Sequence, residues 1–431
     1  MGVLKPVLVA VVAVFVYTRV IQYKGDNLPV NFGGTCDEDF QGVVDVFRRN
    51  VESGKEPGGA FAVYYQGRPV IDVWGGYADP QSYRPWEENT TTVVFSCSKG
   101  MAAILMAKMV EEGLLDYSRL VSDYWPEFGQ NGKENVTVEM LISHQAGVPF
   151  LDTPLSLREC KINKEKCAQV LAQQKPAWPP GTAFGYHALT FGLYVDELIE
   201  RADPQHRDTA TLFRELIGEP FGVDFGMNTP RAEFHRTARL QTRSKAQLLM
   251  DALTYRRYLT PMSQIVFTPD SMMAKSVAPI VEYAQSTETL NDPAVREVTV
   301  SSCSGTGTAR GLAKMYGILT NGGTEDGKTI LSPNMMKSLA TPLLVGKDVV
   351  MLTGEQSQLG RGTLYRKNPK GQRCVGHTGF GGQVAIGDLE NGLGLSYLTN
   401  HLSINGVGDD PRFRDVEEAL YETIDRIQKN S

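Results

Sequence analysis

Apolar residues recur every three to four positions over residues 40–52, which predicts an amphipathic helix. Two runs rich in β-branched and aromatic residues follow at 58–65 and 69–74, and the short turn between them predicts a β-hairpin. The segment 100–110 is apolar on nearly all sides, so it predicts a buried helix that ends near Gly113. The early part of the chain therefore predicts a helix and a hairpin ahead of a central helix.

From about residue 154 to 290 the apolar spacing is mostly helical, with interruptions at 179–181 and 220–222. Strand patterns return late in the chain, at 297–301, 375–377, 383–388 and 394–399. A final amphipathic helix is predicted over 413–428. This order predicts an α+β fold, an α/β sandwich in which an antiparallel sheet built from both chain ends is flanked by helices and interrupted by a mainly helical insertion.

The same patterns divide the chain into three parts. We expect a hydrophobic signal or anchor segment at 1–25, a polar linker at 26–39 and one folded domain at 40–430. Within the domain, residues 40–98 and 297–430 are expected to form the sheet region, and residues 99–296 the mainly helical region.

The N-terminal run at 7–17 is unbroken apolar sequence, which suits the core of a secretory signal better than a bilayer span of about 20 residues. No small-x-small cleavage site follows, so an uncleaved anchor over 6–21, with Arg19 at the interface, competes with a cleaved signal. Both interpretations predict the secretory pathway, membrane-anchored or secreted, where sequons at Asn89 and Asn135 permit glycosylation. A mitochondrial targeting segment is a third interpretation, weakened by the few arginines.

Charge and cysteine content exclude several classes of protein. The 43 basic and 49 acidic residues give a net charge of -6 without long blocks of like charge, so no nucleic-acid partner is indicated. Scattered histidines, six widely spaced cysteines and the absence of a nucleotide-binding glycine pattern indicate neither a metal nor a cofactor. Cys160 and Cys167 can form a disulfide only if the chain turns between them, because seven helical residues span roughly 10 Å.

The candidate chemistry begins at Ser96, just ahead of the apolar helix. Ser96 and Lys99 lie about one helical turn apart, so their side chains share a face. An amine beside a hydroxyl at a helix N-terminus can take the hydroxyl proton and so activate the oxygen as a nucleophile. The alternative is an N-cap serine next to a solvated lysine.

Motifs elsewhere in the chain favour the nucleophile. They are, in chain order, 72–79 (DVWGGYAD), Ser96-Cys97-Ser98-Lys99 (an SxxK element), 141–149 (LISHQAGVP), 186–192 (YHALTFG), 305–313 (GTGTARGLA) and His377-Thr378-Gly379. With these motifs the chain resembles, over about 43–427, the serine β-lactamase and penicillin-binding-protein superfamily. The resemblance is to the class C-like branch that contains the family VIII carboxylesterases, and it implies a β-lactamase/transpeptidase-like fold and a serine hydrolase that works through an acyl-enzyme.

The resemblance assigns roles to three side chains. Ser96 would attack a carbonyl group and become acylated. Lys99, at a lowered pKa, would share the serine proton. Tyr186 matches the tyrosine of the YxN element and would be the general base and later the acid.

Further residues are implied on the substrate side. The backbone N–H groups of Ser96 and Phe380 would hold the oxyanion, where Phe380 follows the strand triad His377-Thr378-Gly379. His187, beside Tyr186, is an additional candidate for lining the pocket.

Two departures from the family pattern bear on the substrate. Ala188 stands where the YxN element has asparagine, so the side-chain amide that would hold a substrate amide is absent. His377 stands where lysine is usual, and a histidine with a pKa of about 6.5 is a poor anchor for a carboxylate at pH 7. We therefore expect a carboxylesterase acting on small or medium acyl esters. The alternatives are an amidase, peptidase or weak β-lactamase of the same mechanism, and a catalytically silent membrane-tethered scaffold.

Overall fold

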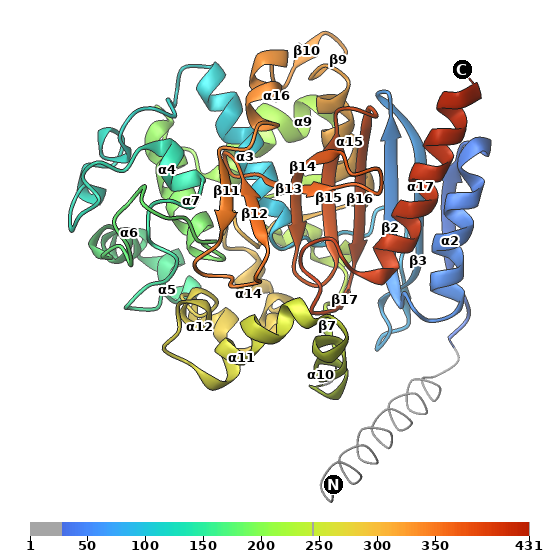
Figure 1. Cartoon of the computed structure of the whole chain (residues 1–431), viewed down its shortest axis with the longest axis horizontal. Coiled ribbons are helices and arrows are strands. Elements are labelled where there is room, and N and C mark those ends of the chain that lie inside the picture. Colours follow the sequence, from blue (N-terminus) through green and yellow to red (C-terminus); the bar gives the residue numbers. More distant parts are fainter. Residues whose placement is uncertain (1–27, 244, 431) are drawn as a thin grey trace, which may run out of the picture.

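The computed structural model describes residues 28–243 and 245–430 (Figure 1). The expected signal or anchor segment at 1–25 lies outside this range. Within the range, no helix combines the length and the apolar character needed to cross a membrane. The described chain is built around one large sheet with helices on both faces and a helical region beside it (Figure 1).

Ten strands form the large sheet, in the order β1-β3-β2-β16-β15-β14-β13-β12-β11, with β4 paired to β3. They are β1 (Phe32–Cys36), β2 (Gly58–Tyr65), β3 (Arg68–Asp79), β4 (Arg84–Pro85), β11 (Leu344–Lys347), β12 (Gln356–Leu359), β13 (Leu364–Lys367), β14 (Arg373–Gly379), β15 (Gln383–Asp388) and β16 (Leu393–Thr399). All neighbouring pairs are antiparallel, and the β2–β16 pair runs from Tyr65 opposite Leu393 to Gly59 opposite Thr399. This confirms an antiparallel sheet built from both chain ends.

Short strands and helices complete the described fold. The remaining strands are β5 (Thr92–Val93), β6 (Phe225–Gly226), β7 (Gln241–Thr242), β8 (Thr306–Gly307), β9 (Thr324–Glu325), β10 (Lys328–Thr329) and β17 (His401–Leu402). The α-helices are α2 (Gln41–Glu52), α3 (Cys97–Glu111), α4 (Val138–Ile142), α5 (Leu157–Ile162), α6 (Lys164–Gln173), α7 (Thr190–Ala202), α8 (Thr209–Phe213), α9 (Glu219–Phe221), α10 (Lys245–Thr254), α11 (Leu259–Phe267), α12 (Met272–Ser276), α13 (Val281–Gln285), α14 (Pro293–Arg296), α15 (Ala309–Thr320), α16 (Pro333–Leu339) and α17 (Pro411–Asn430).

The sheet lies between two layers of helices. The terminal helices α2 and α17 lie side by side on one face (Figure 1), where Tyr397 of β16 packs against Phe47 and Phe413 at ring distances of 5.9 and 5.8 Å. On the other face α3 and α15 pack against the strands. The amphipathic sequences of α2 and α17 match this arrangement, because each buries one stripe of side chains and exposes the other.

The helix α3 is buried on all sides, as its apolar sequence predicts. Its side chains from Cys97 to Ala107 are buried between the sheet and the helical region. The helix ends at Glu111, and Gly113 follows with φ +74°, a conformation that favours glycine. The centre of the molecule therefore holds the helix that begins at the candidate nucleophile.

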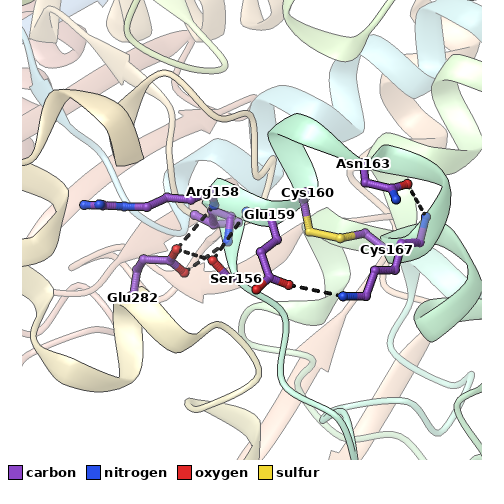
Figure 2. Close-up of a disulfide and its surroundings, with 9 residues drawn as sticks. Ser156, Arg158, Glu159, Cys160, Asn163, Cys167 and Glu282 are labelled. Atoms are coloured by element: carbon purple, nitrogen blue, oxygen red, sulfur yellow. Dashed lines mark hydrogen bonds and ion pairs between the residues drawn. A yellow bond between two sulfur atoms is a disulfide. The ribbon is translucent and has the colours of Figure 1, made fainter.

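Cys160 and Cys167 form a disulfide (Figure 2). The helix α5 ends at Ile162 and α6 begins at Lys164, so the chain turns at Asn163. The Asn163 side chain accepts a hydrogen bond from Lys166 N at 3.1 Å and caps α6. This turn brings the two Cα atoms to 5.6 Å, which meets the condition that the sequence set for the bridge.

The strand predicted at 297–301 is wrong. This segment follows α14, and its N–H groups donate to nearby backbone and side-chain oxygens instead of to a neighbouring strand. Glu297 N donates to Pro293 O at 3.1 Å, Val300 N to Ser304 Oγ at 2.7 Å, and Ser301 N to Asp196 Oδ2 at 3.0 Å. Val300 is buried and Val298 and Thr299 are half-buried, but no strand of the described chain runs beside the segment.

Strands also occur where none was predicted. β1 lies inside the expected linker at 26–39 and pairs with β3, so that part of the linker is an edge strand. The strands β11, β12 and β13 form the opposite edge, are four residues each and show mixed burial. Such short, half-exposed strands leave little periodic signal in a sequence.

Candidate active site

The first helical turn of α3 carries the candidate nucleophile. Ser96 directly precedes the helix, and its hydroxyl makes no capping bond to a backbone N–H. Phe95, just before it, has φ +46°, a conformation that residues with side chains rarely adopt and that recurs at functional sites. Lys99 is fully buried. The alternative of an N-cap serine beside a solvated lysine is therefore wrong.

Two side chains meet at the Ser96 hydroxyl, Lys99 from the same helical turn and Tyr186 from a distant part of the chain. Lys99 Nζ lies 3.1 Å from Ser96 Oγ, and the Tyr186 hydroxyl donates a hydrogen bond to Ser96 Oγ at 2.8 Å. Lys99 Nζ also donates to Ala188 O at 2.7 Å and to Ser302 O at 3.0 Å. The structure thus brings together Ser96, Lys99 and Tyr186, the three residues expected from the sequence.

The partners of Lys99 determine what its amine can do. A neutral amine has two N–H donors and one lone pair, and two carbonyl oxygens, Ala188 O and Ser302 O, accept both donors. The remaining neighbour is Ser96 Oγ, which faces the lone pair. The Ser96 hydroxyl can then donate its proton to Lys99 while it accepts a hydrogen bond from Tyr186. The geometry fits proton transfer from serine to lysine.

Burial moves the pKa values of the two candidate bases in opposite directions. Desolvation lowers the pKa of Lys99 to about 7, against a small opposing effect of Cys303 and Cys97. Desolvation raises the pKa of Tyr186, which outweighs the opposite effect of its hydrogen bond to Ser96. Near neutral pH Lys99 changes its charge, whereas Tyr186 stays a phenol and a donor. These shifts favour Lys99 over Tyr186 as the group that receives the serine proton.

A buried carboxylate that sequence reasoning missed holds the loop of Tyr186. Asp348 Oδ2 accepts a hydrogen bond from Tyr186 N at 2.9 Å, and its Oδ1 accepts from Val350 N and Met351 N, both at 2.8 Å. In the sequence, Asp348 is marked only as a single acidic residue directly before an apolar run. Ser302, which was also missed, contributes a backbone oxygen, and such a group has no side-chain signature.

His187 is placed differently from the expected pocket-lining role. Its Nε2 accepts a hydrogen bond from Val148 N at 3.0 Å, and its Nδ1 lies 2.6 Å from Gly185 O. Both ring nitrogens are thus used inside the protein, and desolvation lowers its pKa to about 4. His144 Nδ1 accepts a hydrogen bond from His187 N at 3.1 Å. The two histidines fix the loop behind Tyr186 because they tie its backbone to the segment at 144–148.

The end of β14 approaches the backbone of Ser96 closely. A Cβ at Gly379 would lie 2.5 Å from Val94 O and 3.3 Å from Ser96 N, so only glycine fits there. The next residue, Phe380, has a half-exposed ring that packs edge-to-face on Phe95 at 5.7 Å. The two residues expected to supply oxyanion donors, Ser96 and Phe380, therefore stand at the contact between α3 and β14, beside an aromatic rim.

The other two residues of the triad are engaged inside the protein. Desolvation lowers the pKa of the buried His377 to about 3, and its Nδ1 lies 2.5 Å from Thr378 O. Its ring lies 5.9 Å from that of Tyr186. The Thr378 hydroxyl donates to Gly406 O at 2.7 Å. His377 is therefore neutral at physiological pH and provides no cation for a substrate carboxylate.

Comparisons with known proteins find relatives over most of the chain. A family model described as Beta-lactamase matches residues 43–419. The esterase/beta-lactamase LipL of Mycobacterium tuberculosis is 32% identical over 386 residues, which cover 86% of this chain and 83% of LipL. A family VIII carboxylesterase structure is 32% identical, with a TM-score of 0.77 and coverage of 91% of this chain and 99% of that one. EstA from Arthrobacter nitroguajacolicus Rue61a is 28% identical, with a TM-score of 0.76 and coverage of 92% and 99%.

Proposed function

The chain belongs to the beta-lactamase family, and from this premise we propose that it hydrolyses esters of uncharged acyl groups through an acyl-enzyme at Ser96. Its fold is β-lactamase/transpeptidase-like, and it is a carboxylesterase-like serine hydrolase. The observation that carries the role of Ser96 is the 3.1 Å contact of its Oγ with Lys99 Nζ, whose two other neighbours are carbonyl oxygens.

In the proposed acylation step Ser96 Oγ bonds to the ester carbonyl carbon as its proton passes to Lys99 Nζ. The backbone N–H groups of Ser96 and Phe380 stabilise the negative charge that develops on the carbonyl oxygen. The carbon–oxygen bond to the alcohol then breaks, and the alcohol leaves with a proton from the Lys99 ammonium. Tyr186 OH, which bonds Ser96 Oγ, can relay this proton.

Deacylation uses the same groups in the reverse order. Water gives a proton to Lys99 Nζ and attacks the acyl carbon, and the bond between that carbon and Ser96 Oγ breaks. Ser96 regains its proton, and the acid leaves. Because Lys99 is neutral again after each half-reaction, one amine serves both steps.

An uncharged acyl group is the substrate class that the site favours. A substrate carboxylate would need a cation, and burial keeps His377 neutral in the position where the family usually has lysine. A substrate amide would find no side-chain amide to bind it, because Ala188 stands where the family pattern has asparagine. An ester needs neither, and the half-exposed Phe380 offers an apolar surface to its acyl group.

The test compares a short p-nitrophenyl ester with a chromogenic cephalosporin. We expect the ester to be hydrolysed faster, and we expect Ser96→Ala to abolish both ester hydrolysis and labelling by a fluorophosphonate probe. Faster lactam turnover would contradict the ester assignment. Absence of labelling in the unsubstituted protein would favour the silent scaffold.

We further propose that the N-terminal apolar run directs the protein into the secretory pathway and tethers it to a membrane. The disulfide Cys160–Cys167 supports an oxidising compartment, and the sequon residues Asn89 and Asn135 are exposed. Expressed in animal cells, the protein should lose mass on deglycosylation and stay in the pellet after alkaline carbonate extraction. An unglycosylated protein in mitochondria would support the targeting alternative instead.

A further inference from the structure

Large apolar side chains are exposed together on α10 and α11. Within residues 253–267 the exposed fractions are Leu253 50%, Leu259 39%, Ile265 40%, Val266 62% and Phe267 81%. On α11, Leu259, Val266 and Phe267 are seven and eight positions apart, so they lie on one face of the helix. Clustered exposed apolar side chains of this kind mark a surface that contacts a partner or a membrane.

The inner side of the same segment is attached to the active-site rim. Tyr258, between α10 and α11, packs with Ala252 and Ile404 in a small core of its own. Its hydroxyl donates to Asp409 Oδ1 at 2.8 Å and accepts from Gly406 N at 2.9 Å. The segment is thereby bonded to the loop at 403–410.

That loop borders the proposed oxyanion site. Gly406 O accepts the hydrogen bond of the Thr378 hydroxyl at 2.7 Å, and a Cβ at Gly406 would lie 3.9 Å from Phe380 Cα. Arg257 makes ion pairs with Asp409 at 3.7 Å and Glu355 at 3.0 Å, which join the segment to a second loop. The exposed apolar face is therefore connected, through one loop, to the strand end that holds the reacting carbonyl.

Charge and position both favour a lipid surface over a protein partner. Between Asp251 and Asp270 the only charged residues are Arg256 and Arg257. Arg257 is ion-paired, whereas Arg256 is exposed, so Arg256 places a positive charge beside the exposed apolar side chains. The apolar run at 7–17 is separated from residue 28 by ten residues, a reach of about 35 Å. The described chain begins in the lower part of Figure 1, where α10, α11 and α12 also lie.

We propose that α10 and α11 form a lipid-binding surface through which the enzyme rests on an anionic membrane and takes ester substrates from it. An amphipathic helix with apolar side chains on one face and arginine beside them binds at the level of lipid headgroups. The uptake of ester substrates from the membrane rests on the esterase function proposed above, whereas the binding of α10 and α11 to lipid does not.

The binding test places a tryptophan reporter on this surface of the full chain. The variants are Phe267→Trp and, as a control, Leu389→Trp at the turn after β15, where the native leucine is 38% exposed. Vesicles of phosphatidylcholine and phosphatidylserine with brominated acyl chains should quench the extra fluorescence of Phe267→Trp about twofold more than that of Leu389→Trp. Adding Arg256→Glu should weaken vesicle binding at this position about fivefold.

The activity test separates the surface from the chemistry. The double variant Val266→Ser, Phe267→Ser should hydrolyse soluble p-nitrophenyl acetate as before but a long-chain ester in vesicles about tenfold more slowly, because two apolar anchors are lost. Equal quenching at both reporter positions, or an unchanged vesicle rate, would overturn the proposal. Shielding of the Phe267→Trp reporter that rises with protein concentration in the absence of vesicles would overturn it in favour of a contact between copies. A protein that binds vesicles but hydrolyses no ester would refute the esterase function and leave the lipid surface standing.

Discussion

Two buried lysines, Lys99 and Lys133, are alike in their exposure and differ in their third neighbour. Both are fully buried. Lys133 Nζ donates to three carbonyl oxygens, Gln130 O at 3.0 Å, Ala172 O at 2.8 Å and Gln174 O at 2.7 Å. Lys99 Nζ has two carbonyl neighbours, and its third neighbour is the Ser96 hydroxyl.

The difference separates a structural amine from a reactive one. A carbonyl oxygen only accepts, so Lys133 needs all three of its protons to satisfy its partners. A hydroxyl can also donate, so Lys99 satisfies its partners with or without its third proton. Burial lowers both pKa values, to about 8 for Lys133 and about 7 for Lys99. Burial alone therefore does not make a lysine a base; a partner that can give up a proton is also required.

The largest effect should come from Lys99→Met. This change removes the proton acceptor, and we expect kcat/KM for a p-nitrophenyl ester to fall about 10³-fold. The variant leaves Ala188 O and Ser302 O without the Lys99 donor, so the rate is compared for the folded fraction, which circular dichroism measures. If the variant kept more than a tenth of the activity, another group would accept the Ser96 proton, and the distinction between a reactive Lys99 and a structural Lys133 would be wrong.

Tyr186→Phe tests whether the serine needs a second donor. The change removes only the hydrogen bond to Ser96 Oγ and keeps the ring contact with His144 at 5.1 Å. We expect kcat to fall about 10²-fold with little change in KM, since the phenol assists proton transfer more than binding. If the rate loss exceeded that of Lys99→Met, Tyr186 would be the principal base, as the family resemblance implies.

Lys133→Met is the matched structural substitution. It leaves two buried carbonyl oxygens, Ala172 O and Gln174 O, without a donor, because Gln130 O keeps its bond from the backbone N–H of residue 133. We expect the free energy of unfolding to fall by about 3 kcal/mol. Urea denaturation measures the loss, and kcat/KM of the folded fraction should be unchanged. A specific loss of activity at full stability would mean that Lys133 also takes part in the reaction.

The smallest effect on stability should come from the disulfide. The disulfide joins Cys160 of α5 to Cys167 of α6. The carbonyl groups that accept from Lys133, those of Ala172 and Gln174, lie at the C-terminal end of α6. Cys160→Ser with Cys167→Ser should lower the free energy of unfolding by about 2 kcal/mol. An unchanged denaturation midpoint in the double variant would show that the disulfide does not contribute to the stability of the fold.

The reactive lysine could be predicted from the sequence, whereas its environment could not. Ser96 and Lys99 are one turn apart, and local spacing places them on one face. Tyr186 depended on a motif, and its contact with Ser96 is made across 90 residues of sequence. The acceptors at Ala188 and Ser302 are backbone oxygens, so their residue types carry no information.

The fold shows the same division between strong and weak patterns. The buried helix α3 and the central strands β15 and β16 were predicted because each contains a run of apolar residues, whereas β14 was predicted only over its middle residues, 375–377. The segment at 297–301 has a strand-like composition, but the side chains of Asp196 and Ser304 accept the hydrogen bonds of two of its N–H groups, those of Ser301 and Val300. His187 was expected in the pocket because it adjoins Tyr186, yet its ring turns toward the backbone of Val148.

The most direct test of the role of Lys99 is the pH dependence of Ser96 acylation, measured as the rate of labelling by a fluorophosphonate probe between pH 5.5 and 9. Burial lowers the pKa of Lys99 from its ordinary value to about 7, so the neutral, proton-accepting form increases as pH rises through 7. The same shift means that the unfolded chain binds the extra proton more readily, so the buried Lys99 destabilises the fold most below pH 7. We predict a labelling rate that rises about tenfold per pH unit below 7 and levels off above it. A rate that does not change with pH, or that is still rising tenfold per unit at pH 9, would contradict the assignment of Lys99 as the base.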